Sequence, residues 1–210
     1  FLYTVPMFHC NGWGYPWTAA LIHAKIICCR YIIAKDIYKL IDQHKVTHFG
    51  GAPIVLSLIA NADEKDKKDI KHKVFVLTAG APPTSAILEK MDNLGFEVMH
   101  VYGLTETYGH ILQCAWNEEW NDYPNSEKAD IKARQGVRYP NTEEVCVADP
   151  ETYKHVPRDG ETMGEILIRG NVVMKGYYKN KEATEASMKK GWFHSGDLAV
   201  VYPNGYIQIK

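Results

Sequence analysis

The chain has 210 residues, of which 46% are hydrophobic and 23% are charged, so it can bury one large core or two small ones. Its 24 Lys and Arg residues nearly balance its 25 Asp and Glu residues, and the formal net charge is −1. This balance excludes a general nucleic-acid binder, because affinity for a phosphate backbone requires clustered positive charge. No uninterrupted apolar run is long enough to predict a transmembrane segment.

The cysteine and histidine patterns predict neither disulfides nor zinc. The five cysteines are odd in number and form no C-x-x-C pair, which favours a reducing compartment such as the cytoplasm. The nine histidines show neither H-E-x-x-H nor zinc-finger spacing. The chain opens on the strand-like FLYTVPMF and closes on the strand-like YIQIK, so we expect a piece of a longer protein.

Residues 1 to about 115 alternate short apolar runs with helical patterns. The runs predict strands within 25–33, 46–53, 73–80 and 97–103, and helices over 34–45, 53–62 and 84–95. Strands and helices alternating at this spacing predict an α/β subdomain with a parallel sheet. Ligands of such sheets bind beyond the carboxyl ends of the strands, and three of those ends carry unusual residues: HFGGAP, LTAGAPP and VYGLTET.

The pattern changes after a polar stretch at 116–136, which we interpret as a connector. Short, alternating, turn-bounded runs follow at 143–149, 164–170 and 194–210. Asn204-Gly205 between two of these runs is typical of a β-hairpin turn. The sequence therefore predicts a smaller β-rich subdomain over 137–210.

The stretch VYGLTET combines residue types that suit a nucleotide. Tyr102 offers an aromatic face to a base, Gly103 allows close backbone approach, and Thr105 can bond a phosphate. Glu106 is a hard oxygen ligand suited to Mg²⁺. The ordinary alternative is a strand-to-helix connection with Thr105 or Thr107 as its cap.

Three other stretches carry candidate residues with equally ordinary alternatives. In HSGDLA, Asp197 can accept two hydroxyls, as a ribose requires, or can be a turn aspartate. TAGAPP forms a rigid backbone wall or a simple loop. In PMFHCNGWG, His9 lies near Trp13 after a strand, where a structural histidine is more common than a catalytic one.

In this order, PMFHCNGW, TAGAPP, YGLTET, GEILIRG, GWFHSGDLA and GYIQIK resemble the adenylate-forming (AMP-dependent) acyl-CoA synthetase family. The resemblance covers essentially the whole chain, and KARQGVRY and NVVMKGYYKN are most similar to the short- and medium-chain or aromatic acyl-CoA ligases. It implies that the first region is an α/β subdomain of a large N-terminal domain. The second region would be that domain's distorted β-barrel subdomain.

The resemblance implies roles for the nucleotide-binding residues. Tyr102 would stack on adenine with Gly103 beside it, Thr105 would contact the α-phosphate, and Glu106 would bind Mg²⁺. Asp197 would hold the ribose hydroxyls.

The resemblance implies a second set of roles on the acyl side. Gly80, Ala81 and Pro82 would form the wall beside adenine and the acyl pocket. His9 would lie where the acyl pocket meets the CoA channel, as a catalytic and substrate-binding residue, with Trp13 in the pocket.

The implied reaction joins a small carboxylic acid to CoA in two steps. The carboxylate attacks the α-phosphate of Mg·ATP to give an acyl-adenylate, and the CoA thiolate then displaces AMP. The family's lysine-containing phosphate loop and its C-terminal domain with the adenylation lysine are not in this sequence, so we expect residues 1–210 alone to be inactive. The alternatives are a luciferase-like enzyme, a peptide-synthetase adenylation domain, or a non-catalytic nucleotide-binding module.

Overall fold

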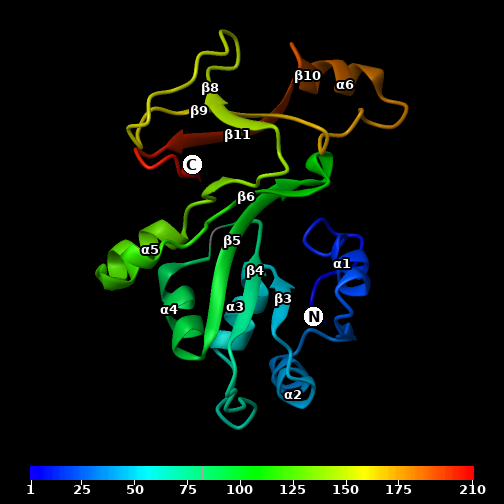
Figure 1. Cartoon of the computed structure of the whole chain (residues 1–210), viewed down its shortest axis with the longest axis vertical. Coiled ribbons are helices and arrows are strands. Elements are labelled where there is room, and N and C mark those ends of the chain that lie inside the picture. The colour runs from blue at the N-terminus through cyan, green and yellow to red at the C-terminus, as the bar shows by residue number, and fades with distance from the viewer. Residues whose placement is uncertain (82) are drawn as a thin grey trace. The chain divides into compact units, whose positions relative to one another are not determined.

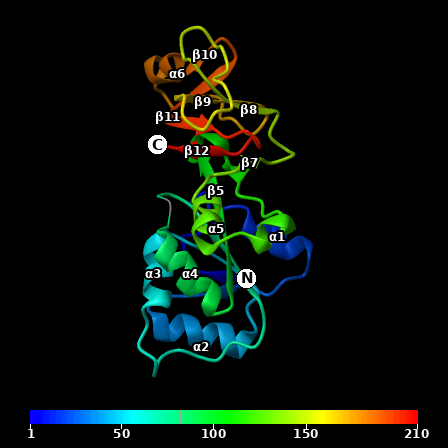
Figure 2. The ribbon, with the colours of Figure 1, turned by 90° about the vertical axis from the view of Figure 1, so that its left-hand side faces the viewer.

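The structure is a computed structural model that describes residues 1–81 and 83–210, and its contacts divide the chain into two compact units (Figures 1 and 2). The first unit contains Phe1–His100 and Trp116–Ala133, and the second contains Val101–Ala115 and Arg134–Lys210. The sequence predicts an α/β subdomain that ends at residue 115 and a β-rich subdomain that begins after residue 136, and these boundaries stay a prediction. Compared with it, the contacts assign 101–115 to the second unit and 116–133 to the first.

The first unit contains the parallel sheet that the sequence predicts. Its strand order is β2-β1-β3-β4-β5, and every neighbouring pair is parallel. The strands are β1 (Leu2–Tyr3), β2 (Ile27–Cys28), β3 (His48–Gly51), β4 (Val74–Thr78) and β5 (Phe96–Leu104). The carboxyl ends of the parallel strands β3 and β4 lie at one edge of this sheet, so the loops HFGGAP and LTAGAPP leave from neighbouring strand ends.

One predicted strand is much shorter than expected. The apolar run 25–33 predicts a buried strand, but only Ile27–Cys28 pair in the sheet, and Tyr31, Ile32 and Ile33 are exposed. The chain leaves the sheet there because Ile33 is the extended N-cap residue of the next helix. An apolar run alone does not distinguish a strand from such a connection.

Three predicted helices of the first unit are confirmed, and each buries an apolar face in its core. They are α2 (Ala34–His44), α3 (Pro53–Ala60) and α4 (Ser85–Asn93). Pro53 stands in the first turn of α3, where its missing N–H costs nothing. Ile37, Ile41, Leu56, Ile59 and Met91 are among the fully buried residues that join these helices to the sheet.

The sequence analysis missed the other helices of the first unit. These are α1 (Tyr15–Leu21), the 3₁₀ helix η2 (Glu118–Asp122) and α5 (Asn125–Lys132). The stretch interpreted as a connector thus contains η2 and α5. α5 lies beside α4, as Figures 1 and 2 both show, and Lys132 forms an ion pair with Asp92. This packing explains why residues 116–133 belong to the first unit.

The second unit is mainly antiparallel, as predicted for a β-rich subdomain. One sheet has the order β10-β11-β9-β8, with β12 paired to β11. Its strands are β8 (Glu144–Ala148), β9 (Gly164–Arg169), β10 (Met188–Lys189), β11 (Trp192–Val201) and β12 (Ile207–Ile209). Gly205 has a φ of 83° in the β11–β12 connection, so the predicted hairpin at Asn204-Gly205 is confirmed.

The end of β5 also belongs to this unit. It pairs with β6 (Gly109–Gln113), which pairs with β7 (Val137–Arg138), both antiparallel. The 3₁₀ helix η1 (Thr105–Thr107) joins β5 to β6, and α6 (Lys181–Ser187) precedes β10. Tyr102 on β5 is a member of the unit's apolar core, together with Ile111, Ile166 and Phe193.

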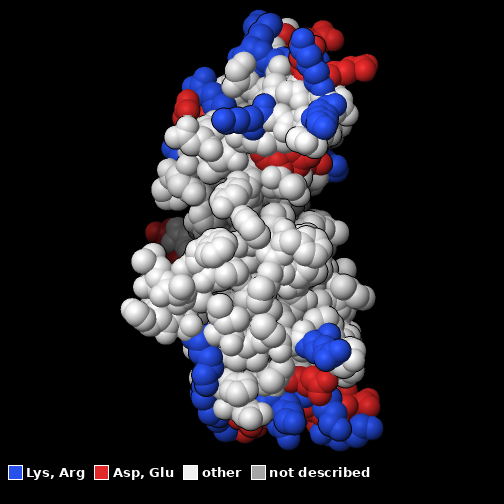
Figure 3. Space-filling view, turned by 90° about the vertical axis from the view of Figure 1, so that its right-hand side faces the viewer, with Lys and Arg blue, Asp and Glu red and all other residues white. Residues whose placement is uncertain are grey.

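The surface of the first unit carries large apolar side chains. Phe8, Trp17, Leu21 and Ile22 are between 61% and 82% exposed. In Figure 3 the face of this unit shows mostly uncharged residues, with basic and acidic residues together toward its lower edge. Among the described residues, no helix is both long and apolar enough to cross a bilayer.

Candidate functional site

The stretch VYGLTET forms a tight strand-to-strand turn. The Thr107 hydroxyl accepts a hydrogen bond from the Leu104 N–H and donates one to the Gly109 carbonyl, both at 2.9 Å. A Cβ on Gly103 would collide with the Gly109 backbone, so this glycine is required by the close approach of β6. The ordinary alternative, a strand-to-helix connection with Thr105 or Thr107 as its cap, agrees with the short 3₁₀ helix η1, in whose capping bonds Thr107 takes part, although η1 leads directly into another strand, β6.

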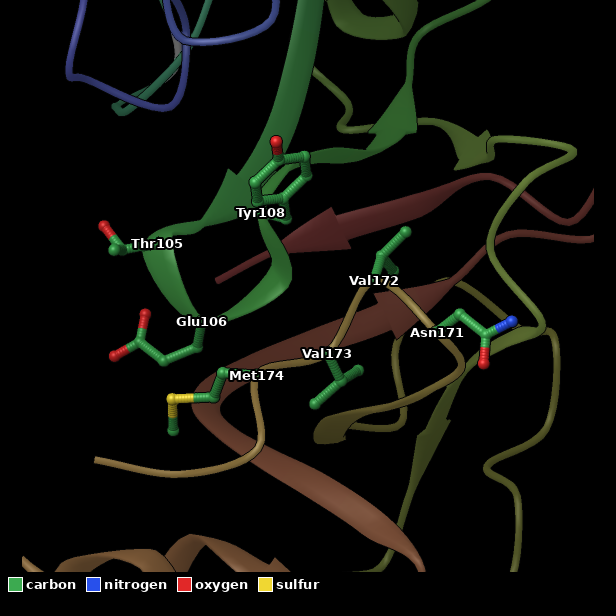
Figure 4. A pocket seen from close by; sticks show the side chains of 7 residues that line it. All are labelled: Thr105, Glu106, Tyr108, Asn171, Val172, Val173 and Met174. Atoms are coloured by element: carbon green, nitrogen blue, oxygen red, sulfur yellow. The ribbon is translucent and has the colours of Figure 1, made fainter. Parts of the chain in front are cut away.

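The two residues between Leu104 and Thr107 face a cavity of about 320 Å³. Thr105, Glu106 and Tyr108 line it from the turn, and the loop 171–174 lines the opposite wall. Figure 4 shows the Thr105 hydroxyl and the Glu106 carboxylate directed to the same side of the turn. The side-chain hydrogen bonds within the turn come from Thr107, whereas the Thr105 and Glu106 side chains line the cavity.

Glu106 is held in place from the loop that follows β9. Its carbonyl oxygen accepts a bond from the Met174 N–H at 2.7 Å, and its Oε1 accepts one from the Tyr177 hydroxyl at 3.0 Å. This carboxylate raises the pKa of Tyr177, mainly through the hydrogen bond. The sequence analysis did not single out Tyr177, although it lies in NVVMKGYYKN, one of the stretches that carried the resemblance.

Tyr102 and Asp197, 95 positions apart, are in direct contact. The Tyr102 hydroxyl donates to Asp197 Oδ2 at 2.5 Å. The Tyr102 side chain is only 8% exposed, and burial together with the Asp197 carboxylate raises the pKa of Tyr102, so the hydroxyl keeps its proton. The structure thus brings together two of the residues that the sequence analysis assigned to the nucleoside.

Asp197 lies within an irregular segment of β11 that no local sequence pattern predicted. The register of β11 against β9 shifts between His194 and Leu198. Glu165 on β9 bonds both the His194 ring and the Gly196 N–H. The sequence signal for this contact is a glutamate in the otherwise apolar and buried run Gly164–Ile168.

The remaining candidate residues lie in the first unit. His9 is exposed, and its Nδ1 accepts a bond from the Asn11 N–H at 3.2 Å. Trp13 is 39% exposed and packs edge-on against Trp17 with 6.1 Å between ring centroids. Asn11 Nδ2 donates to the Leu77 carbonyl at 3.2 Å, so the loop carrying His9 and Trp13 is tied to the carboxyl end of β4.

The loop after β4 holds the predicted wall. Gly80 has a φ of 95°, a conformation that favours glycine, and both Gly80 and Ala81 are exposed. Pro82 lies outside the described residues. Two buried polar atoms at this edge, Asn11 Oδ1 and Thr78 Oγ1, have no hydrogen-bond partner among the residues that the structure describes. Unpaired buried polar atoms are costly, and a ligand or water commonly satisfies them.

Known proteins resemble this chain over its whole length. A peroxisomal acetate/butyrate–CoA ligase of Arabidopsis thaliana is 51% identical over 211 residues, which cover 100% of this chain and 37% of that protein. An acetate–CoA ligase of Humulus lupulus is 52% identical with the same coverage. A peroxisomal benzoate–CoA ligase of Arabidopsis thaliana is 45% identical, and the chain covers 36% of it. The chain therefore spans little more than a third of the length of these relatives.

Solved structures support the fold. The N-terminal domain of FACL13 from Mycobacterium tuberculosis has a TM-score of 0.82 at 25% identity, over 100% of this chain and 50% of that one. An o-succinylbenzoate CoA synthetase from Bacillus subtilis, in complex with ATP and a magnesium ion, has a TM-score of 0.77 at 23% identity, over 99% and 40%. The sequence model of the AMP-binding enzyme family matches residues 1–178. The chain, an α/β unit followed by a β-rich unit, therefore belongs to the AMP-binding enzyme family.

Proposed function

We propose that the full-length protein is an AMP-forming acid–CoA ligase, which activates a carboxylic acid with ATP and transfers the acyl group to CoA. The observation that carries the proposal is the contact between Tyr102 and Asp197, because it joins an aromatic ring and a carboxylate, the two groups that a nucleoside needs. Membership in the AMP-binding family supports a nucleotide at this contact. The relatives named as CoA ligases support CoA as the acyl acceptor.

The residues of the second unit would bind the nucleotide and its metal ion. Asp197 would accept the ribose hydroxyls, the Tyr102 ring would contact adenine, and Thr105 would donate to the α-phosphate. When bound, Mg²⁺ neutralises phosphate charge. Glu106 fits such an ion: its carboxylate lines the cavity, and the bond from Tyr177 occupies only Oε1. The described residues hold no group of three or more His, Cys, Asp or Glu that could bind a metal, so phosphate and water oxygens would complete the coordination.

The first unit would supply the acyl side. Gly80, Ala81 and Pro82 would form the wall beside adenine and the acid, and His9 and Trp13 would line the acyl pocket and the entry of CoA. Asn11 Oδ1 and Thr78 Oγ1, which find no partner among the described residues, support a polar ligand at this edge. The protein's contribution to both steps is to position the reactants and to stabilise developing charge.

The substrate would be a short-chain aliphatic or an aromatic acid. Relatives are named for acetate, butyrate, 2-methylpropanoate and benzoate. Two of these names also carry a peroxisomal location, and the cysteine pattern favours a reducing compartment, so we propose that the protein acts in the cytoplasm or the peroxisome.

Replacing Asp197 with alanine in the full-length protein tests the proposed function. A hydrogen bond to a charged group contributes about 1.5–3 kcal/mol, so the loss should weaken ATP binding by roughly ten- to a hundredfold. It should also reduce the preference for ATP over 2′-deoxy-ATP. The measurement is the dissociation constant of both nucleotides by calorimetry.

Asp159 is the matched control for this substitution. It is an exposed turn aspartate of the same unit, whose Oδ1 accepts bonds from the Glu161 and Thr162 N–H groups. Asp159→Ala should leave both dissociation constants unchanged. If Asp197→Ala behaves in the same way, Asp197 is only a turn residue and the proposed nucleoside site is wrong.

Replacing Trp13 with alanine tests the acyl side. Enlarging a pocket wall by this side chain should shift the preferred acid toward longer or wider substrates, since one methylene is worth about 1–3 kcal/mol of selectivity. Adenylate chemistry should be retained. The measurement is kcat/KM over acids of graded length and over benzoate, with Trp116→Ala as the control for loss of a tryptophan elsewhere in the first unit. An unaltered profile would assign Trp13 to the protein's own packing.

A further inference from the structure

The strand that carries Asp197, β11, contains a β-bulge with two extra residues. His194 pairs with Leu167 and Leu198 with Glu165, so Ser195, Gly196 and Asp197 stand opposite the single residue Ile166. Gly196 has a φ of 77°, in the left-handed region that glycine adopts without strain. Bulges of this kind interrupt the ladder of hydrogen bonds and redirect side chains. Here the redirected side chain is Asp197, which meets Tyr102.

Side chains replace the backbone partners that the bulge removes. The Asp197 N–H donates to Ser195 Oγ at 3.1 Å, and the Ser195 hydroxyl donates to the Ile166 carbonyl at 2.7 Å. The Gly196 N–H donates to Glu165 Oε1 at 2.8 Å. Each of these two backbone N–H groups therefore depends on one side chain.

Glu165 makes the less expected of these contacts. It is 8% exposed within the run Gly164–Ile168, which is buried throughout, and burying a carboxylate is unfavourable unless it is hydrogen-bonded. Both of its oxygens are bonded, because Oε2 lies 2.9 Å from His194 Nδ1. The other ring nitrogen of His194 lies 3.1 Å from the Tyr153 hydroxyl. The carboxylate thus spans the bulge, with one oxygen on Gly196 and the other on a histidine that is itself held in place.

We propose that Glu165 is a positioning residue for nucleotide binding: by accepting the Gly196 N–H it holds the bulge in the shape that directs Asp197 toward Tyr102. The carboxylate is buried, and its two oxygens are bonded to the Gly196 N–H and to the His194 ring. This inference rests on the proposed function in one respect only: the ligand of Asp197 is taken to be a nucleotide. Glu165, the glutamate of GEILIRG on β9, thus shapes a binding site on the neighbouring strand β11.

The test compares Glu165→Leu with Glu165→Gln in the full-length protein. Leucine is of similar size but accepts no hydrogen bond, so it removes the partner of both the Gly196 N–H and the His194 ring. Glutamine keeps an oxygen for the Gly196 N–H, and its amide can donate to the other tautomer of His194. Glu144→Gln, on the adjacent strand β8 and paired with Arg169 at 2.7 Å, is the matched control.

Two measurements are made on each variant. The first is amide hydrogen exchange, by mass spectrometry, of peptides spanning 192–199 in the nucleotide-free protein. The second is the ratio of dissociation constants for ATP and 2′-deoxy-ATP. We expect Glu165→Leu to speed exchange at the bulge and to reduce the nucleotide preference about tenfold, with kcat at saturating ATP much less affected than KM. Glu165→Gln and Glu144→Gln should match the unsubstituted protein in both measurements.

The outcomes separate this inference from the proposed function. Wild-type exchange and wild-type nucleotide preference in Glu165→Leu would overturn it, as would a Glu165→Gln variant that is as impaired as Glu165→Leu. If Asp197→Ala itself leaves the nucleotide preference unchanged, the proposed nucleoside site fails. In that case the exchange data on Glu165→Leu still decide whether the carboxylate shapes the bulge.

Discussion

Replacing Glu106 with glutamine in the full-length protein is expected to slow adenylate formation by on the order of 10²- to 10³-fold, the usual cost of removing a group that stabilises developing charge. Glutamine keeps the size of the side chain but not the charge that a Mg²⁺ ligand needs. The effect on folding should be small, because the turn is shaped by Thr107 and the side chain of Glu106 contributes one hydrogen bond with the exposed Tyr177. The amide oxygen of glutamine can still accept this bond from Tyr177.

The measurement for Glu106→Gln is ATP–pyrophosphate exchange at varied Mg²⁺ concentration, with thermal unfolding followed in parallel. Glu182→Gln is the control, since Glu182 is an exposed carboxylate in the first turn of α6 in the same unit. In Glu106→Gln, high Mg²⁺ should partly restore the exchange rate. In Glu182→Gln, the exchange rate should not fall. Exchange at the unsubstituted rate and Mg²⁺ dependence would remove Glu106 from the metal site.

Residues 1–210 expressed alone are expected to form no measurable acyl-CoA and to bind AMP weakly at most. The chain spans 37% of the length of the acetate/butyrate–CoA ligase that it resembles, and the resemblance implies a phosphate loop and a lysine that these residues do not contain. Each missing donor to developing charge commonly costs about 10²–10³ in rate. Losing the parts that close over the reactants adds to this, because closure orients them and excludes water.

The same preparation should tend to aggregate. The first unit exposes large apolar side chains, among them Phe8, Trp17 and Leu21, and such surfaces promote association. The trial is thioester formation from ATP, CoA and a panel of aliphatic and aromatic acids, using monodisperse fractions checked by light scattering. Full-length protein prepared in parallel is the positive control. Turnover by residues 1–210 within tenfold of that control would show that the remaining parts are dispensable.

Local periodicity was enough to predict most of the first unit. The spacing of Ile37 and Ile41 determines which side of α2 is buried, and Pro53 marks the start of α3, because both signals act within one or two helical turns. The run 25–33 shows the limit of this approach. Its apolar residues predict a strand, but Ile32 and Ile33 lead into a helix, and only the paired neighbours decide where β2 ends.

The sequence by itself determined the class of the fold, the family and the two stretches that carry the candidate nucleotide residues. Tyr102, Thr105, Glu106 and Asp197 could be named because glycine, hydroxyl, aromatic and carboxylate groups follow apolar strands in a characteristic order. Their individual tasks within the fold could not be separated from the sequence. Only the structure shows that Gly103 and Thr107 serve the turn, whereas Thr105 and Glu106 face the cavity.

The long-range contacts were decided by tertiary structure alone. The bond from Tyr102 to Asp197 joins residues 95 positions apart, and the bond from Gly196 to Glu165 joins residues 31 apart across a bulge. Both depend on how β11 pairs with β9, and no local pattern specifies a register shift between two strands. A buried glutamate in an apolar strand is visible in the sequence, but its partner becomes known only when the neighbouring strand is in place, because a hydrogen bond requires two groups that packing brings within about 3 Å.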